Sequence, residues 1–237
     1  MANIIAIIPA RGGSKRIPKK NIVDFMGKPM IAWTIEAALN VGSISRVLVS
    51  TDSEEIAAVA REYGAEVPFM RDACADDHSP VSDATALCLV KAEEYYDEKF
   101  DDVVQLMPNC PLRGSQQISD ALDNYHRKSA IAQLSCVDFG WTNPWWALSL
   151  DNEFRPTPLF PQALVSRSQD LAKLYSPTGA VWIAKAQLLK ECRNFYMDGH
   201  IFFPMDWIAG ADIDEPSDLM TAKALFPLST FSQGASV

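Results

Sequence analysis

The sequence predicts an α/β fold with a mostly parallel, doubly wound sheet. In the first third of the chain, short runs of β-branched residues alternate with amphipathic stretches, which is the pattern of βαβ units that build a parallel sheet. Of the 237 residues, 48% are hydrophobic and 22% are charged, so the chain has ample apolar material for a buried core. We interpret residues 1–237 as a single domain in which residues 138–177 form an inserted excursion.

The first predicted unit is a strand, a helix and a second strand. Residues 3–8 (NIIAII) have the pattern of a buried strand, and a long polar loop follows them. Residues 29–41 carry apolar side chains at helical spacing, and Gly42 is a natural stop for this helix. Residues 46–50 (RVLVS) then form the second strand.

The same alternation continues after the second strand. Ser53 opens a helix whose apolar stripe extends to Gly64, and residues 66–70 (EVPFM) return to extended structure. Residues 82–96 have the pattern of a third helix. Residues 102–107 (DVVQLM) are largely apolar and predict another strand.

Four further elements are predicted in the rest of the chain. Residues 116–125 are helical by pattern, and residues 130–137 (AIAQLSCV) are a buried strand. Residues 179–184 (GAVWIA) return to strand character after the excursion. Residues 215–226 (EPSDLMTAKALF) form the last helix, with a proline at a favoured position near its start.

The excursion differs from the βα units in composition. Residues 138–177 bring together three tryptophans, three phenylalanines and several prolines among polar residues. Isolated exposed aromatic side chains in this number would form a sticky patch, so we expect them to pack against something. We therefore predict a small lobe that makes a subunit interface.

Composition also excludes several classes of protein. The chain has 21 Lys and Arg against 30 Asp and Glu, a formal net charge of −9, which repels the phosphates of polymeric nucleic acid. No stretch approaches the roughly 18 apolar residues that a membrane helix needs, and the start of the chain lacks the pattern of a signal peptide. We therefore expect neither a nucleic acid nor a membrane as a partner.

Cysteine usage predicts a reducing compartment. The five cysteines are odd in number and widely spaced, and no two of them form a CxxC pair. This is typical of buried structural thiols in a cytoplasmic protein. They are Cys74, Cys88, Cys110, Cys136 and Cys192.

The strongest local signal is the loop at residues 9–21 (PARGGSKRIPKKN), directly after the first predicted strand. It holds a Gly-Gly pair and five cations within ten positions, namely Arg11, Lys15, Arg16, Lys19 and Lys20. Glycines let backbone N–H groups turn toward phosphate oxygens, and Lys and Arg neutralise their charge. The carboxyl end of the first strand is also where open α/β sheets bind ligands. We predict a polyphosphate-binding loop; the alternative is a solvated basic loop.

The second signal is an acidic segment before the last helix. Asp212 and Asp214 occupy alternate positions of an extended stretch, so their side chains point to the same side. This spacing allows two carboxylates to share a hard divalent cation that also touches phosphate oxygens. Alone, such a segment is often an ordinary acidic helix cap. Together with a polyphosphate loop, it favours a metal site.

Five segments, in order along the chain, then carry a family resemblance: PARGGSKRIPKKN, STD, PLR, PTGAVWIAK and DIDEPSDL. They resemble the cytidylyltransferases that activate nonulosonic acids, the acylneuraminate or CMP-sialic acid synthetase group, over about residues 4–225. The resemblance implies a Rossmann-like nucleotidyltransferase. It would transfer CMP from CTP to the anomeric hydroxyl of a nine-carbon α-keto sugar acid with Mg²⁺, release pyrophosphate, and serve surface glycan synthesis. It also implies a homodimer whose excursion reaches the partner's site.

The resemblance assigns roles to individual residues. The implied catalytic residues are Arg11, Lys20 and Asp214, and Asp214 would also assist deprotonation of the attacking hydroxyl. Asp212 and Asp214 would hold the metal. The implied nucleotide-binding residues are Arg11, Gly12, Gly13, Ser14, Lys15, Lys20, Asn21, Arg71 and Ser82. The implied sugar-binding residues are Met107, Asn109, Arg167, Gln169 and Trp182.

The sequence departs from relatives that act on sialic acid in the sugar half of the site. Met107 replaces a glutamine, Ser168 replaces the second arginine of an RRQDLP motif, and Trp146 stands where some relatives carry a lysine. Losing hydrogen-bonding partners and gaining apolar walls suits a deoxygenated, acylated sugar. We therefore expect a substrate of the legionaminic or pseudaminic type rather than plain N-acetylneuraminate.

Two alternatives remain from the sequence. The departures at Met107, Trp146 and Ser168 are compatible with a non-catalytic or weakly active relative that binds CTP or sugar as a regulator or scaffold. The second alternative is a cytidylyltransferase for the eight-carbon acid Kdo, or a sugar-1-phosphate nucleotidyltransferase. The length of the loop at residues 9–21 disfavours this second alternative.

Overall fold

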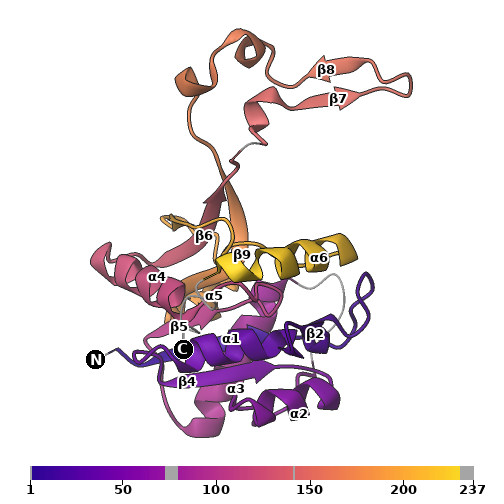
Figure 1. Cartoon of the computed structure of the whole chain (residues 1–237). Coiled ribbons are helices and arrows are strands. Elements are labelled where there is room, and N and C mark those ends of the chain that lie inside the picture. Colours follow the sequence, from indigo (N-terminus) through magenta and orange to yellow (C-terminus); the bar gives the residue numbers. More distant parts are fainter. Residues whose placement is uncertain (1, 73–79, 141, 230–237) are drawn as a thin grey trace.

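A six-stranded sheet forms the centre of the computed structural model, which describes residues 2–72, 80–140 and 142–229. The strand order is β10-β6-β9-β5-β1-β4 (Figure 1). The strands are β1 (Ile4–Pro9), β4 (Arg46–Ser50), β5 (Asp102–Gln105), β6 (Ala132–Asp138), β9 (Tyr175–Lys185) and β10 (Ile201–Met205).

The sheet is mostly parallel, as predicted, with one reversed strand. β1 pairs in parallel with β4 and β5, and β10 pairs in parallel with β6. β9 lies between β5 and β6 and is antiparallel to both. The reason is that β6 leaves the sheet at its carboxyl end to form the excursion, and the chain returns along β9 at that same end, with Asp138 opposite Tyr175.

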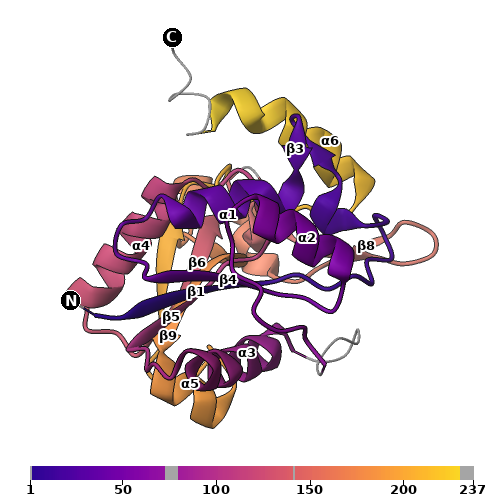
Figure 2. The same ribbon diagram turned by 90° about the horizontal axis from the view of Figure 1, so that it is seen from below.

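Helices cover both faces of the sheet (Figure 2). One face packs against α1, α2 and α4, and the other packs against α3 and α5. A sixth helix, α6, packs with a short β2–β3 hairpin in a third cluster. The bounds are α1 Met30–Leu39, α2 Glu54–Glu62, α3 Val81–Tyr96, α4 Ser115–Arg127, α5 Ala186–Cys192, α6 Pro216–Leu225, β2 Asp24–Phe25 and β3 Lys28–Pro29.

The first strand shows why the apolar run in the sequence is unbroken. Ile4, Ala6 and Ile8 belong to the cluster on one face, whereas Ile5 and Ile7 belong to the cluster on the other face. A strand with helices on both sides needs apolar side chains at every position. β1 is therefore an interior strand that contributes side chains to the core on both faces of the sheet.

The excursion forms an arm that projects from the sheet, away from the helical layers (Figure 1). The antiparallel strands β7 (Leu148–Leu150) and β8 (Pro156–Pro158) form a hairpin in the arm. Three short 3-10 helices surround them, η2 (Pro144–Trp146), η3 (Pro161–Val165) and η4 (Ser168–Asp170). Asp138 belongs to β6 and residues 175–177 belong to β9, so the arm is four residues shorter than the predicted segment.

In the part of the chain that the structure describes, no helix combines the length and the apolar character needed to cross a membrane. The four cysteines of the described residues are free thiols. Cys88, Cys110 and Cys136 are buried, and Cys192 is exposed. Cys74 lies outside the described residues.

Candidate active site

The loop after β1 is held tightly to the end of the neighbouring strand. The Ala10 amide donates to the carbonyl of Ser50 at 2.9 Å, and the Gly12 amide donates to Oδ1 of Asp52 at 2.8 Å. A Cβ atom on Gly12 would lie only 3.1 Å from Cβ of Ser53, so a glycine suits this close approach. The carboxylate of Asp52 therefore fixes the start of the loop.

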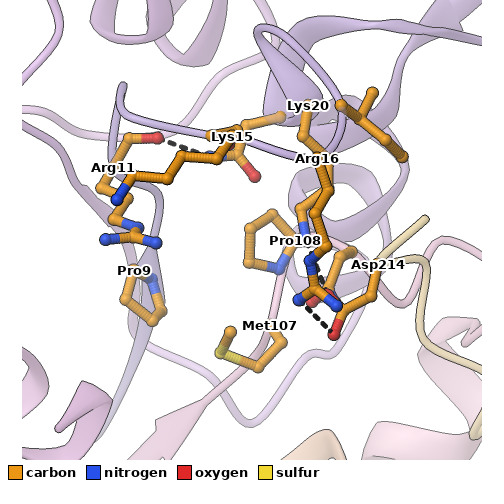
Figure 3. A pocket seen from close by; sticks show the side chains of 12 residues that line it. Pro9, Arg11, Lys15, Arg16, Lys20, Met107, Pro108 and Asp214 are labelled. Carbon is orange, nitrogen blue, oxygen red and sulfur yellow. Dashed lines mark hydrogen bonds and ion pairs between the residues drawn. The ribbon is translucent and has the colours of Figure 1, made fainter. Parts of the chain in front are cut away.

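Asn21 closes the same loop from the inside. Its side chain is buried, and its Nδ2 donates to the carbonyl of Arg11 at 2.9 Å. Lys19 has a φ of +52°, which reverses the chain before the 3-10 helix η1 (Lys20–Ile22). The loop thus folds back, with Arg11 on one side of a space and Arg16 and Lys20 on the other (Figure 3).

This space is a pocket of about 380 Å³ (Figure 3). Its lining comes from the loop, the β5–α4 connection and the segment before α6: Pro9, Arg11, Ser14, Lys15, Arg16, Ile17, Lys20, Asn21, Met107, Pro108, Asn109 and Asp214. Five of the nine residues predicted to bind the nucleotide are in this lining, whereas Gly12, Gly13, Arg71 and Ser82 are not. Arg16 also lines the pocket; it is one of the five cations of the predicted loop but is not among the nucleotide-binding residues that the resemblance implies.

Asp214 connects the cationic loop to the acidic segment. Lys20 Nζ lies 2.8 Å from Oδ1 of Asp214 and 3.0 Å from the carbonyl of Ile213. Arg16 Nη2 donates to Oδ2 of Asp214 at 2.9 Å (Figure 3). Burial opposes ionisation of this carboxyl, but the hydrogen bonds and charges of Lys20 and Arg16 outweigh it and lower the pKa of Asp214. Asp214 is therefore a carboxylate at neutral pH.

Asp212 borders a second pocket, of about 710 Å³. Ile213 is buried between the two aspartates, so the alternation predicted from the sequence is present. The surrounding walls, and then the nearby Asp214 carboxylate, raise the pKa of Asp212. The lining residues are Val137, Asp138, Phe139, Gly140, Thr142, Ser176, Pro177, Thr178, Trp207, Gly210, Ala211 and Asp212.

The two aspartates fit the requirements of a divalent cation bound together with phosphates. Their mutual repulsion, which raises the pKa of Asp212, would be relieved by a cation between them. Within the described ranges, no group of three or more His, Cys, Asp or Glu side chains is arranged to hold a metal. Mg²⁺ commonly binds through one or two carboxylates and takes its other ligands from substrate phosphates and water. Asp212 and Asp214 match that donor set.

The wall opposite the loop is built by residues 107–109 and supported by a buried arginine. Arg113 is fully buried, and its guanidinium donates to Oγ1 of Thr34 at 2.8 Å and to the carbonyls of Met107 and Ala180. Burial lowers the pKa of Arg113 to about 10, so it remains charged at neutral pH. Beneath the wall, a Cβ atom on Gly179 would lie 2.8 Å from Cγ of Met107, so the absence of a side chain there lets Met107 pack.

Comparison with known proteins identifies the family. The model of the family described as cytidylyltransferase matches residues 5–143 of this chain. A pseudaminic acid cytidylyltransferase of Campylobacter jejuni is 34% identical over 223 residues, which span 94% of this chain and 95% of that relative. The chain belongs to the cytidylyltransferase family. It is therefore a nucleotidyltransferase, as the sequence motifs predicted.

Two further similarities extend this result. A CMP-N,N'-diacetyllegionaminic acid synthase of Legionella pneumophila is 34% identical over 230 residues, which span 95% of this cytidylyltransferase and 97% of that relative. The solved structure of a CMP:2-keto-3-deoxy-manno-octonic acid synthetase complexed with CTP aligns with a TM-score of 0.69 at 19% identity, over 96% of this chain and 99% of that chain. At this identity the likeness concerns the fold alone, and it confirms the predicted Rossmann-like fold.

Neither Arg71 nor Ser82 of this cytidylyltransferase lines the pocket of the loop, although Arg71 lies close to the loop. Arg71 Nη2 is 3.7 Å from Oδ1 of Asp52, the same atom that accepts the Gly12 amide. Ser82 is buried in the first turn of α3. Asp52 thus links Arg71 to the loop, and the predicted contacts of Arg71 and Ser82 with the nucleotide stay predictions.

The remaining predicted sugar-binding residues lie away from the pocket within one chain. Trp182 packs edge-on against Phe195 and Tyr196, with ring centroids 5.4 and 5.8 Å away, and its Nε1 donates to the carbonyl of Thr178 at 2.7 Å. Arg167 and Gln169 are in the arm. Arg167 pairs there with Asp170 at 2.7 Å, and Gln169 borders a groove at the base of the arm.

Proposed function

We propose that this cytidylyltransferase transfers CMP from CTP to the anomeric hydroxyl of a nonulosonic acid and releases pyrophosphate. The observation that carries the proposal is the contact of Lys20 and Arg16 with Asp214 inside a cationic, loop-lined pocket. This contact supports the proposal because it brings two cations of the loop against one of the two carboxylates that fit a metal. The substrate class is supported by the names of the relatives, which are a pseudaminic acid cytidylyltransferase and a legionaminic acid synthase.

The chemistry requires neutralisation and alignment of the triphosphate. Arg11, Lys15 and Lys20 line the pocket and would neutralise the oxygen charges, while Asn21 holds the loop in shape. The ordered loop positions the α-phosphorus for in-line attack. This mechanism needs no covalent intermediate and hence no nucleophilic side chain.

We propose that Asp212 and Asp214 hold a Mg²⁺ ion. When bound, the ion supplies charge stabilisation for the triphosphate and the leaving pyrophosphate. Lys20 and Arg16 then exchange their contact with Asp214 for contacts with phosphate oxygens. Asp214 contacts both Lys20 and Arg16, and its carboxylate would accept the proton of the attacking hydroxyl.

We propose that the sugar acid occupies the pocket beside Asp212. Apolar side chains form much of its wall, among them Val137, Phe139, Pro177 and Trp207. The hydroxyl of Thr178 is already engaged, because it donates to the carbonyl of Gly210 at 2.7 Å. Such a wall favours deoxy and acylamino groups over hydroxyl groups, which supports a legionaminic or pseudaminic type of substrate.

We further propose a homodimer in which the arm of each protomer reaches the partner's site. Several apolar side chains of the arm are exposed, including Phe154 at 79% and Val165 at 89%. Aromatic and aliphatic groups exposed in this number are typical of an interface. Arg167 and Gln169, which line neither pocket in their own chain, would then act in the partner's sugar site. A cytoplasmic location fits the free thiols.

The test is pyrophosphate release with Mg²⁺ and CTP against N-acetylneuraminate, legionaminate, pseudaminate and Kdo, with ATP, GTP and UTP as nucleotide controls. We expect release with CTP and a nine-carbon acid, with higher kcat/KM for a deoxy, acylamino acid than for N-acetylneuraminate. Comparable kcat/KM values for all nine-carbon acids would contradict the assignment of the apolar wall. CTP binding without turnover on any acid would favour a regulatory or scaffold role.

A further inference from the structure

Asn109 makes the most extensive contacts with the acidic segment of any residue in the opposite wall. The amide of Ile213 donates to the carbonyl of Asn109 at 2.8 Å. In the other direction, Asn109 Nδ2 lies 3.3 Å from the carbonyl of Ile213 and 3.4 Å from Oδ1 of Asp214. Asn109 therefore brackets Ile213, the residue between the two aspartates, through both its backbone and its side chain.

Asn109 differs in kind from the other partners of Asp214. Lys20 and Arg16 carry positive charge, so a triphosphate in the pocket competes with Asp214 for them. The Asn109 amide is neutral and gains little from phosphate. It is also only 6% exposed, which restrains it in its present position. Asn109 is thus the partner that can stay on Asp214 when nucleotide binds.

The position of Asn109 is fixed from below by the buried arginine. Arg113 donates to the carbonyl of Met107, two residues before Asn109, and to the carbonyl of Ala180 on β9. The amide of Cys110 also donates to the Met107 carbonyl, at 3.4 Å. The connection between β5 and α4 is therefore tied to the sheet at one end and to the acidic segment at the other.

We propose that Asn109 is a positioning residue that holds Asp212 and Asp214 in the geometry needed to bind a divalent cation, rather than a contact for the sugar. This inference rests on the proposed function, because it concerns the same metal site. Groups that orient metal ligands typically affect metal affinity or activity by about 10-fold to 100-fold when they are removed. The expected signature is weaker metal binding with unchanged recognition of the sugar.

The experiment measures Mn²⁺ binding by electron paramagnetic resonance in the presence of a CTP analogue that carries a methylene group between the α and β phosphorus atoms. We expect Asn109→Ala to bind Mn²⁺ about 10-fold to 100-fold more weakly than the wild type. Asn109→Ser is made in parallel, and both variants are measured well below their unfolding temperatures, since loss of a buried amide also lowers stability. For both variants, the KM for the sugar acid should stay within about twofold of the wild-type value, because residue 109 does not contact the sugar in this proposal.

The matched control is Asn124→Ala on α4. Asn124 also uses its side-chain amide inside the fold, donating to Oε1 of Gln133 at 2.6 Å, but it is remote from the pocket. We expect this control to bind Mn²⁺ like the wild type. If both Asn109 variants bind Mn²⁺ as tightly as the wild type, with or without a raised KM for the sugar, the inference about Asn109 is overturned while the proposed metal site stands. Absence of nucleotide-dependent Mn²⁺ binding in the wild type would overturn the proposed metal site and the inference together.

Discussion

Lys20 links the phosphate loop to the acidic segment through a single ammonium group. Its Nζ contacts both the carboxylate of Asp214 and the carbonyl of Ile213, and only 18% of its side chain is exposed. In the absence of substrate it neutralises the Asp214 carboxylate. In the proposed function, a triphosphate in the pocket would take Lys20 as a donor to its oxygens, so the same group would serve both states.

We therefore expect Lys20→Met to lower kcat/KM for CTP by about 100-fold or more, because one preorganised donor to the reacting phosphates is lost. Steady-state pyrophosphate release measures this change. The matched control is Lys19→Met, since Lys19 pairs with Glu55 at the surface at 2.7 Å and does not line the pocket. Surface ion pairs contribute little, so the control should stay within about twofold of the wild type. Equal losses in both variants would show that the net charge of the loop matters rather than this contact.

At the residue scale, the sequence predicted contacts that are local and missed contacts that are distant. The glycines and cations of the loop are contiguous, so their purpose could be inferred from spacing. Arg16 and Asp214 are 198 positions apart, and only the fold brings them together. Arg113 is a charged residue that composition assigns to the surface, yet it is fully buried and supports the pocket wall. Side-chain burial of this kind depends on tertiary packing that no local pattern reports.

At the scale of elements, Glu93 joins the two helices that cover one face of the sheet. Its carboxylate in α3 accepts from Lys190 of α5 at 2.8 Å and from Lys99 at 2.7 Å, and it is 2% exposed. Burial opposes ionisation, but the hydrogen bonds from Lys190 and Lys99 outweigh it and lower the pKa of Glu93 from its ordinary value of 4.5. This ion pair therefore contributes to stability only while Glu93 is charged.

Glu93→Gln is expected to lower the free energy of unfolding at pH 7 by about 1.5–3 kcal/mol, the range for a buried hydrogen bond to a charged group. The difference in the free energy of unfolding between the wild type and Glu93→Gln is fully present above pH 4.5. It is lost as the pH falls through the lowered pKa of Glu93, because protonation then removes the negative charge that the substitution also removes. Urea denaturation at a series of pH values measures both effects. The control is Glu94→Gln, an exposed neighbour on the same helix. If the difference in the free energy of unfolding between the wild type and Glu93→Gln does not change with pH, the charge of Glu93 makes no contribution to stability.

The elements themselves were largely predictable where their patterns are strong. The βαβ units of the first half have unbroken apolar strands and clear helix starts, such as Ser53, whose side chain accepts from the Ile56 amide. β10 was missed because Pro204 interrupts its strand pattern, and the sheet tolerates this proline because β10 is an edge strand paired with β6. The reversed direction of β9 was also missed, since it follows from where the arm leaves and re-enters the sheet.

At the scale of the whole molecule, the arm separates two groups of residues that the proposed reaction needs together. The aspartates and the phosphate loop lie at the sheet, whereas Arg167 and Gln169 lie in the arm, which projects away from it (Figure 1). The arm also exposes apolar side chains that a partner would cover. In the proposed homodimer, a second copy of the chain would account for both features, because its arm would bring Arg167 to the site on the body of the first copy.

Subunit mixing tests this arrangement directly. Asp214→Asn is expected to inactivate the site on the body of a protomer and to leave its arm intact, whereas Arg167→Ala is expected to impair the arm and to leave the body intact. If the arm acts in the partner's site, dissociating and reassociating an equal mixture of the two inactive variants should restore about a quarter of wild-type activity, since one site in half of the randomly formed dimers is complete. Pyrophosphate release measures the recovery.

The same mixture also distinguishes the alternative in which each arm serves its own site. In that case every site carries one of the two substitutions, and mixing restores no activity. Reassociation of Asp214→Asn with itself is the control for recovery caused by the procedure alone. A sedimentation profile of stable monomers at micromolar concentration would contradict the shared site independently of activity, because the exposed apolar side chains of the arm, with Val165 at 89%, would then have no partner copy to cover them.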